Sequence, residues 1–150
     1  MIEKIVSGGQ TGVDRAGLDA AIALGTPHGG WCPRGRKAED GTIPTIYQFQ
    51  ETPTGDYRQR TEWNVRDSDG TLILTRGEPT GGTALTIRLA TAHDKPCLVL
   101  DLEESPSPVA VRGWVTANDI RVLNIAGPRE SGCPGIHDQV LEFLTTTLRG

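Results

Sequence analysis

The glycines and small polar residues of the segment SGGQTGVDR, from Ser7 to Arg15, have the spacing of an anion-binding turn. The segment follows the apolar run Ile2 to Val6 and leads into a stretch with helical periodicity. Glycines let backbone N–H groups approach a ligand closely, and a helix that begins near Val13 adds unpaired N–H groups and its positive dipole end. We expect a phosphate or a carboxylate there, although a strand-to-helix turn without a ligand also fits this segment taken alone.

The turn belongs to neither of two common nucleotide-binding loops. A dinucleotide fingerprint would need glycine where the chain has Ser7, and an acidic residue after the second strand, where the chain has the basic run Pro33 to Lys37. A Walker A loop would need Gly-Lys-Ser/Thr at a fixed interval after the first glycine, and the chain has none. A nicotinamide cofactor is therefore disfavoured.

Two further loops follow apolar runs that resemble strands. Thr75 to Thr83, which contains PTGGT, follows TLIL, and Gly127 to Gly132 follows RVLNIA. Ligands of open α/β sheets lie beyond the carboxyl ends of the strands, where the strand order reverses. If TLIL neighbours the first strand, as in the standard Rossmann order, two glycine-rich turns that each open a helix converge on one anion. We therefore expect SGGQTG and PTGGT to be adjacent at the carboxyl edge of a parallel sheet.

The side chains near these turns form the candidate binding set. Guanidinium groups match the geometry of phosphate, and glutamine and threonine offer uncharged hydrogen bonds. The predicted ligand-binding residues are Gly8, Gly9, Gln10, Thr11, Gly12, Arg15, Arg34, Arg36, Arg76, Gly81, Gly82, Thr83 and Arg129. We expect two or three of the five arginines to contact the ligand. Asp14 is explained by its place in the first turn of a helix, where a carboxylate favours the dipole.

The sequence contains no evident catalytic set. His28, His93 and His137 are scattered, and no Ser, Cys or Lys stands beside a histidine. No paired carboxylates follow the predicted strands. The catalytic residues stay unknown, and the sequence favours a binding protein over an enzyme.

The cysteines argue against a disulfide framework and a zinc site. Cys32, Cys97 and Cys133 are odd in number and have no C-x-x-C spacing. Cys97 lies in an apolar run and is expected in the core. Cys32 and Cys133 each precede a proline, and packing is favoured over exposure for both thiols. No metal-binding residue is predicted.

Length and charge limit the class of protein. A chain of 150 residues suits one domain, residues 1–150. The net charge of −4 gives no basic field for nucleic acid or an anionic membrane, so an anion site must be local. The sequence shows no membrane-spanning run and no signal peptide, and the expected location is the cytoplasm.

Alternating strands and helices predict an α/β protein with a Rossmann-like, doubly wound, mainly parallel sheet flanked by helices. The predicted strands are Ile2–Val6, Thr71–Leu74, Cys97–Leu102 and Arg121–Ala126, with poorer ones at His28–Cys32 and Ile46–Gln50. The predicted helices are Val13–Leu24, Thr83–His93, Gly135–Leu148, a weaker Pro108–Ala117, and one after an N-cap at Asp56.

The segment from Pro33 to about Thr54 is long and polar, which in a compact domain indicates a functional or mobile connection. On the helix after it, Tyr57, Arg60 or Thr61, and Asn64 share one face. That face lines a site or is an ordinary solvated helix side, and the sequence leaves both interpretations open.

The motifs SGGQTGVDRAGLDAA, GGWCPRGRKAEDG, YRQRTEWNVRDSDGTLIL, GGT and LNIAGPRES with PGI occur in this order over nearly the whole chain. They resemble the molybdenum cofactor carrier family, a branch similar to lysine-decarboxylase-like and lonely-guy-type Rossmann proteins. The resemblance implies a subunit, often of a homo-tetramer, that binds, stores and transfers molybdenum cofactor (molybdopterin), or molybdate, at its strand carboxyl ends. It implies molybdoenzymes or cofactor-synthesis proteins as partners, and it makes Cys32 the one soft ligand to consider for the metal.

The chain departs from the lonely-guy-type hydrolases at one motif. Those enzymes carry P-G-G-x-G-T-x-x-E, whose glutamate takes part in hydrolysis. Here the segment from Thr80 to Thr86 lacks the extra glycine, and Leu85 and Thr86 stand where the acid belongs. A phosphate-binding scaffold remains. A nucleotide-directed hydrolase and a module that senses a nucleotide derivative stay open as alternatives to the carrier.

Overall fold

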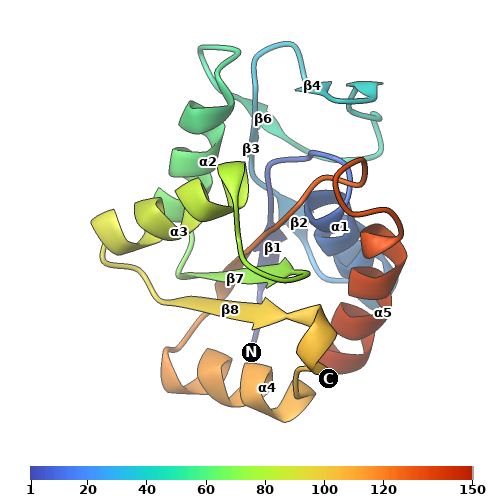
Figure 1. Ribbon diagram of the computed structural model, residues 1–150. Helices are drawn as coiled ribbons and strands as arrows, with labels where there is room; N and C mark the ends of the chain where they lie inside the picture. Colours follow the sequence, from blue (N-terminus) through green and yellow to red (C-terminus); the bar gives the residue numbers. More distant parts are fainter. Residues whose placement is uncertain (150) are drawn as a thin grey trace.

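The computed structural model describes residues 1–149 and contains a five-stranded parallel sheet with helices on both faces (Figure 1). The strand order is β2-β1-β9-β7-β8. The strands are β1 (Lys4–Val6), β2 (His28–Gly29), β7 (Gly70–Thr75), β8 (Cys97–Asp101) and β9 (Val122–Ala126). All pairings within this sheet are parallel. The predicted α/β class, with a doubly wound and mainly parallel sheet, is confirmed.

The helices form two layers. They are α1 (Val13–Leu24), α2 (Tyr57–Arg66), α3 (Gly81–Ala92), α4 (Pro108–Ala117) and α5 (Ile136–Leu148), with a short 3-10 helix at Leu102–Glu104. Helix α5 packs against α1 and α4, and α2 packs against α3 on the other side of the sheet (Figure 1). The side chain of Asp56 caps α2 by accepting a hydrogen bond from Arg58 N, as its sequence position predicts. No helix among residues 1–149 is long and apolar enough to cross a membrane.

Strand β7 passes through the middle of the core. All six of its residues are buried, and Leu72, Ile73 and Leu74 are 0% exposed. Because helices cover both faces of the sheet, this strand is buried along its whole length instead of alternating between buried and exposed residues. The same core includes Val13 at the start of α1 and Ile136 at the start of α5, so packing fixes where both helices begin.

The expectation that the TLIL strand neighbours the first strand is wrong, because β9 lies between them. Lys4 pairs with Val122 on one side of β9, and Thr71 pairs with Asn124 on the other. Leu123 and Ile125 of β9 are 0% exposed, so the last strand of the chain takes the central position, where its apolar run is covered on both faces. The local apolar pattern of β9 did not reveal this order.

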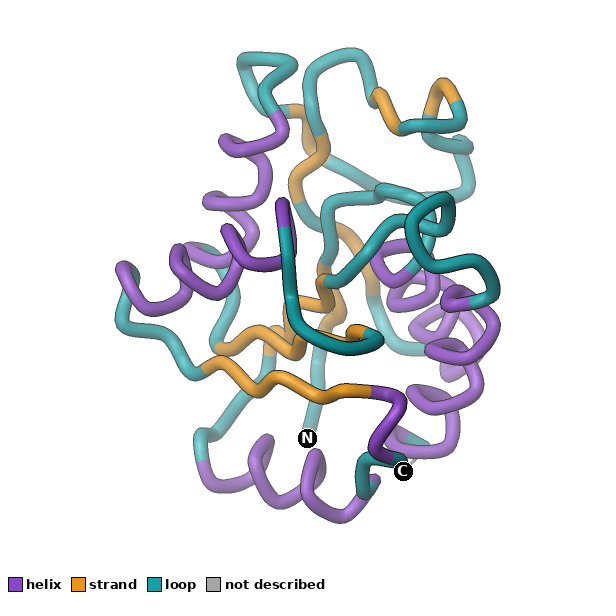
Figure 2. The backbone as a smooth tube through the Cα atoms, in the orientation of Figure 1, coloured by secondary structure: helices purple, strands orange, loops and turns teal. Residues whose placement is uncertain are grey.

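The predicted strand His28–Cys32 is divided into β2 and β3 (Trp31–Cys32). Gly30, with φ of +119°, separates them and lies so close to Ser7 that a side chain would meet its carbonyl oxygen at 2.7 Å. Beyond this bend, β3 pairs with β6 (Gln50–Glu51). The polar connection between them is mostly loop (Figure 2), with one short hairpin formed by β4 (Lys37–Ala38) and β5 (Gly41–Thr42).

Candidate anion-binding cavity

A cavity of about 350 Å³ lies at the carboxyl edge of β1, β7 and β9. The loops that follow these three strands line it together with the first turns of α2 and α3. The lining residues include Gln10 and Asp14 after β1, Thr75, Arg76, Glu78, Thr80, Gly82 and Thr83 after β7, Pro128, Arg129, Ser131 and Cys133 after β9, and Tyr57, Arg58 and Arg60 on α2. The two glycine-rich turns therefore line one cavity although their strands are not neighbours.

The start of α3 is open towards ligands. No side chain forms an N-cap hydrogen bond at Thr80, and a side-chain carbon built on Gly82 would meet no atom of residues 1–149 within 4 Å. Gly81, with φ of +53°, is equally uncrowded. Thr83 N and Ala84 N donate to the Thr80 carbonyl, so the N–H groups of Gly81 and Gly82, with the positive dipole end of α3, are the ones that an anion would meet.

The glycines of the first turn serve a different purpose, since protein atoms occupy the space beside them. A side-chain carbon on Gly8 would meet the guanidinium of Arg60 at 2.4 Å, and one on Gly12 would meet the carbonyl oxygen of Pro128 at 2.4 Å. The same carbonyl accepts a hydrogen bond from the N–H of Val13 at the start of α1. Gly9 has φ of +79° and lies against aromatic and aliphatic side chains. These glycines permit close packing, and of the glycines and polar residues predicted here only Gln10 lines the cavity.

Two of the five predicted arginines, Arg76 and Arg129, line the cavity. Arg15, Arg34 and Arg36 do not. Arg15 forms two hydrogen bonds with Asp40. The guanidinium of Arg36 donates to three backbone carbonyls of its own loop, those of Ile43, Pro44 and Tyr47. Arg34 is exposed. Arg76 does both, since it lines the cavity and also donates to Gln139 Oε1 and to the Pro134 carbonyl. Sequence position alone did not separate the arginines that face the cavity from those that only hold a loop in place.

Helix α2 contributes residues that the sequence had left open or missed. Arg60 and Arg129 each lie 5.3 Å from the centre of the Tyr57 ring, which gives the cavity a cation–π cluster. Arg58 was not anticipated, although its place after the N-cap Asp56 put it at the exposed start of the helix. Asn64, on the same predicted face, instead binds the backbone of Trp31.

Asp14 was explained by the helix dipole, yet it is a buried cavity residue, 5% exposed. Its Oδ2 accepts a hydrogen bond of 3.2 Å from Gln10 N and lies 3.8 Å from Arg60 Nη1. Burial raises the pKa of this carboxyl, and the positive charge of Arg60 only partly offsets the effect. The charged form is therefore incompletely stabilised by the protein.

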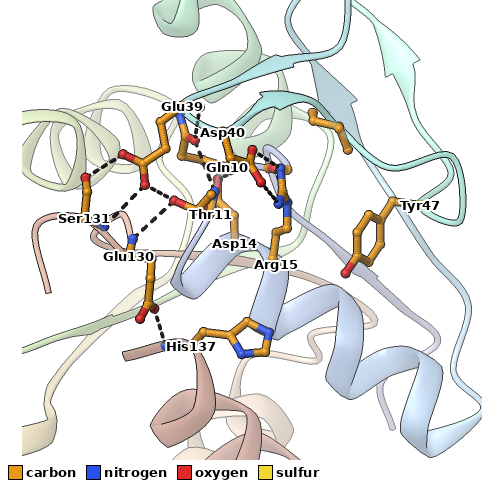
Figure 3. A network of polar contacts seen from close by, with 12 residues as sticks. Gln10, Thr11, Asp14, Arg15, Glu39, Asp40, Tyr47, Glu130, Ser131 and His137 are labelled. Atoms are coloured by element: carbon orange, nitrogen blue, oxygen red, sulfur yellow. Dashed lines mark hydrogen bonds and ion pairs between the residues drawn. The ribbon is translucent and has the colours of Figure 1, made fainter. Parts of the chain in front are cut away.

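A polar network connects the turn of the β4–β5 hairpin to the loops after β1 and β9 (Figure 3). The Glu39 carboxylate accepts hydrogen bonds from the hydroxyls of Thr11 and Ser131 and, at 3.3 Å, from Ser131 N. These bonds lower the pKa of Glu39. The amide oxygen of Gln10 accepts from the N–H groups of Thr11 and Glu39. Thr11 is therefore a residue of this network and does not line the cavity.

The cysteines occupy different surroundings. Cys32 is 0% exposed, and burial raises the pKa of its thiol. Cys97, expected in the core, is only partly buried. Cys133 lines the cavity. Within residues 1–149 no three His, Cys, Asp or Glu side chains form a group that could hold a metal ion.

Comparisons with known proteins agree with this architecture. A model of the circularly permutated YpsA SLOG family matches residues 5–148. The crystal structure of a "putative molybdenum carrier protein" from Syntrophus aciditrophicus SB is similar, with a TM-score of 0.95 and 50% sequence identity. The match covers 98% of this chain and 95% of that one. A comparison with curated proteins found no match.

Proposed function

The chain belongs to the circularly permutated YpsA SLOG family, and from this premise we propose that it binds, stores and transfers the molybdenum cofactor, a phosphorylated pterin that carries molybdenum. The resemblance to the molybdenum cofactor carrier family is confirmed by the Syntrophus structure. The observation that carries the proposal is the combination, in one cavity, of an open helix start at Gly82 with Arg76 and Arg129.

The charge of the cavity supports an anionic ligand. Although the whole chain has a net charge of −4, Arg58, Arg60, Arg76 and Arg129 line this cavity, against two carboxyls. Guanidinium groups bind phosphate and oxo groups through charge-assisted hydrogen bonds, and the dipole of α3 adds to their attraction. The phosphate of the ligand would lie at the start of α3, with Arg76 and Arg129 beside it.

The cavity also fits a ligand with more than a phosphate. Its volume of about 350 Å³ exceeds what a phosphate alone would fill, and two buried polar atoms on lining residues, Gln10 Nε2 and Arg60 Nε, have no hydrogen-bond partner within residues 1–149. Such atoms are rare in folded proteins and indicate a missing partner. In this proposal the protein holds the organic part of the cofactor and does not need to coordinate its metal.

The cavity does not favour the hydrolase alternative. Leu85 and Thr86, which stand where a lonely-guy-type enzyme carries its acid, both line the cavity. No histidine lines it either within the described part of the chain. The proposal extends to a homo-tetramer in the cytoplasm that delivers its ligand to molybdoenzymes or cofactor-synthesis proteins.

Native mass spectrometry of the protein purified from its own cells tests the proposal. We expect intact subunits that carry a phosphorylated pterin, with molybdenum detected in the same peak by elemental analysis. The variant Gly82→Val, purified in the same way, serves as the control and should lack the added mass. A ligand-free parent protein that hydrolyses nucleoside monophosphates would contradict the carrier and favour the hydrolase.

A further inference from the structure

Asp14 is an unexpected residue in a cavity built for an anion. A buried carboxylate repels phosphate. The first turn of α1 does not depend on an acid either, because the N–H groups of Val13 and Arg15 already donate to the carbonyls of Pro128 and Gln10. Its location among the arginines therefore calls for a separate explanation. A carboxylate accepts hydrogen bonds and donates none, so the part of a ligand that meets Asp14 must present N–H or O–H donors.

The hydrogen bonds around Asp14 leave acceptor capacity unused. A carboxylate has about four acceptor positions, and Oδ2 receives one hydrogen bond, from Gln10 N. The nearest guanidinium nitrogen, Arg60 Nη1, is 3.8 Å from Oδ2, which is beyond hydrogen-bond distance, and it donates to Thr61 instead. Burial raises the pKa of Asp14, and the charge of Arg60 and the hydrogen bond from Gln10 N do not cancel that effect.

Gln10 provides the complementary group. Its side chain is buried, 5% exposed, and its Oε1 accepts from the N–H groups of Thr11 and Glu39, which fixes the orientation of the amide. The amide nitrogen Nε2 has no partner within residues 1–149, and neither has Arg60 Nε. Lining residues of one cavity therefore offer an underused acceptor, Asp14, beside unused donors.

This pattern matches one kind of heterocycle edge. In a 2-amino-4-oxopyrimidine ring, an amino group, a ring N–H and a carbonyl oxygen follow one another along one side. The first two can donate in parallel to a carboxylate, and the carbonyl can accept from an amide or a guanidinium. Guanine and pterin rings share this edge. Adenine lacks it, because its ring nitrogen beside the amino group is an acceptor.

We propose that Asp14 and Gln10 form a subsite that reads the 2-amino-4-oxopyrimidine edge of the ligand, while the arginines and the start of α3 bind its phosphate. The proposal rests on the function proposed above and adds the chemical class of the ring. Asp14 determines specificity and Gln10 supports it, and both act through hydrogen bonds to the ring alone.

Calorimetric titration with GMP, IMP, AMP, 6-hydroxymethylpterin phosphate and ribose 5-phosphate tests the subsite. IMP differs from GMP only in lacking the amino group, and ribose 5-phosphate presents the phosphate without a ring edge. We expect GMP to bind at least about tenfold more tightly than IMP, since one hydrogen bond to a charged acceptor is lost. Tighter binding of the pterin than of GMP identifies a pterin as the natural source of the edge, and the reverse order identifies a guanine nucleotide.

Asp14→Asn should reduce the preference for GMP over IMP to less than about twofold and leave ribose 5-phosphate binding no weaker, because Asn keeps an acceptor for Gln10 N. Glu142→Gln, which removes a carboxylate from an exposed position outside the cavity, is the matched control and should keep the preference. If Asp14→Asn fails to fold, the relative affinities of the parent protein for GMP, IMP and AMP test the subsite instead.

Equal affinity of the parent for GMP, IMP and AMP, or an unchanged preference in folded Asp14→Asn, would overturn the subsite while the phosphate site stands. Failure of every probe to bind, ribose 5-phosphate and the pterin included, would overturn the proposed function together with the subsite.

Discussion

The guanidinium of Arg15 on α1 binds the carboxylate of Asp40 through two hydrogen bonds of 2.6 and 2.8 Å (Figure 3). This pair lowers the pKa of Asp40 and holds the β4–β5 hairpin against the first turn. Arg15 also donates to the carbonyl of Gly9, so its donors are directed to protein atoms. An arginine that the sequence suggested for the ligand thus attaches the long loop to the sheet edge.

Arg15→Ala should therefore loosen the loop more than it weakens binding. We expect faster amide hydrogen exchange over residues 36–43, with a loss of global stability of roughly 0.5–1 kcal/mol because Asp40 is partly exposed. Hydrogen exchange followed by mass spectrometry measures both effects. Arg34→Ala, which removes the same charge from an exposed position, is the control. Unchanged exchange in Arg15→Ala would show that other contacts hold the loop.

Two glycine variants separate packing from ligand binding. Gly9→Val would force φ of +79° on a β-branched residue and place its Cβ 2.7 Å from Ile43 Cδ1, so we expect a loss of at least about 2 kcal/mol of stability. In Gly82→Val the Cβ would meet no atom of the described chain within 4 Å, so we expect this variant to fold normally. Its side chain would extend into the space that we propose for the phosphate. Denaturation curves and titration with 6-hydroxymethylpterin phosphate distinguish them. A folded Gly82→Val that binds as the parent does would remove the start of α3 from the site.

The elements of this fold could be predicted because their signals are local. Helices α1 and α4 begin and end where periodicity and capping placed them, and TLIL is a buried strand. The order of the strands depends on which apolar runs are covered on both faces, a property of the assembled layers, and the central place of β9 was therefore missed.

A residue of the site could be predicted from the sequence where its place along the backbone alone determines whether it lines the cavity. Gly82 and Thr83 follow a strand and open a helix, and both line the cavity. Arg36 and Arg129 carry the same charge in similar loops, but Arg36 curls back on carbonyls of its own loop while Arg129 lies beside Tyr57. Such differences depend on tertiary contacts. Asp14 was overlooked because its helix position offered a sufficient local explanation.

The arginines of the cavity should bind the phosphate. We expect Arg129→Ala to weaken binding of 6-hydroxymethylpterin phosphate by about 1.5–3 kcal/mol, since a charge-assisted hydrogen bond is lost, and to leave the fold intact because Arg129 is exposed. Arg36→Ala should instead lower the free energy of unfolding by about 1–3 kcal/mol, because the part-buried carbonyls of Ile43 and Tyr47 lose their hydrogen-bond donor. Titration calorimetry and urea denaturation give the two quantities. Equal loss of affinity in Arg34→Ala would point to long-range charge rather than contact.

The thiols should differ in reactivity. Cys133 lines the cavity, whereas Cys32 is fully buried with a raised pKa, so iodoacetamide should modify Cys133 roughly 100-fold faster in the native protein. Bound 6-hydroxymethylpterin phosphate should slow the reaction at Cys133 and leave Cys32 unaffected. Peptide mapping by mass spectrometry follows each site, with Cys133→Ser as the control. Faster modification of Cys32 would mean that its segment opens readily.

The pH dependence of stability should report on His137. Its Nε2 lies 2.7 Å from Asp19 and its Nδ1 2.8 Å from Asp138, and Tyr47 donates a hydrogen bond to the other oxygen of Asp19. Burial alone would lower the pKa of His137, but the two carboxylates outweigh it and raise the pKa above the usual 6.5. The folded chain thus holds this proton more tightly than the unfolded chain does. The resulting stabilisation is fully present below pH 6.5 and is lost as the pH rises through the folded pKa.

His137→Gln should therefore lower the free energy of unfolding by roughly 0.5–1 kcal/mol at pH 5.5, and the difference from the parent should shrink towards pH 8.5. Urea denaturation of both proteins at several pH values measures it. Asp138→Asn removes one of the two carboxylates while keeping the histidine, so its pH dependence should be weaker than that of the parent. Asp19 lies on α1, His137 on α5 and Tyr47 in the long loop. Deprotonation of His137 should therefore weaken the packing of these three segments against one another. Parallel stability curves for His137→Gln and the parent would show that this cluster does not bind its proton more tightly when folded.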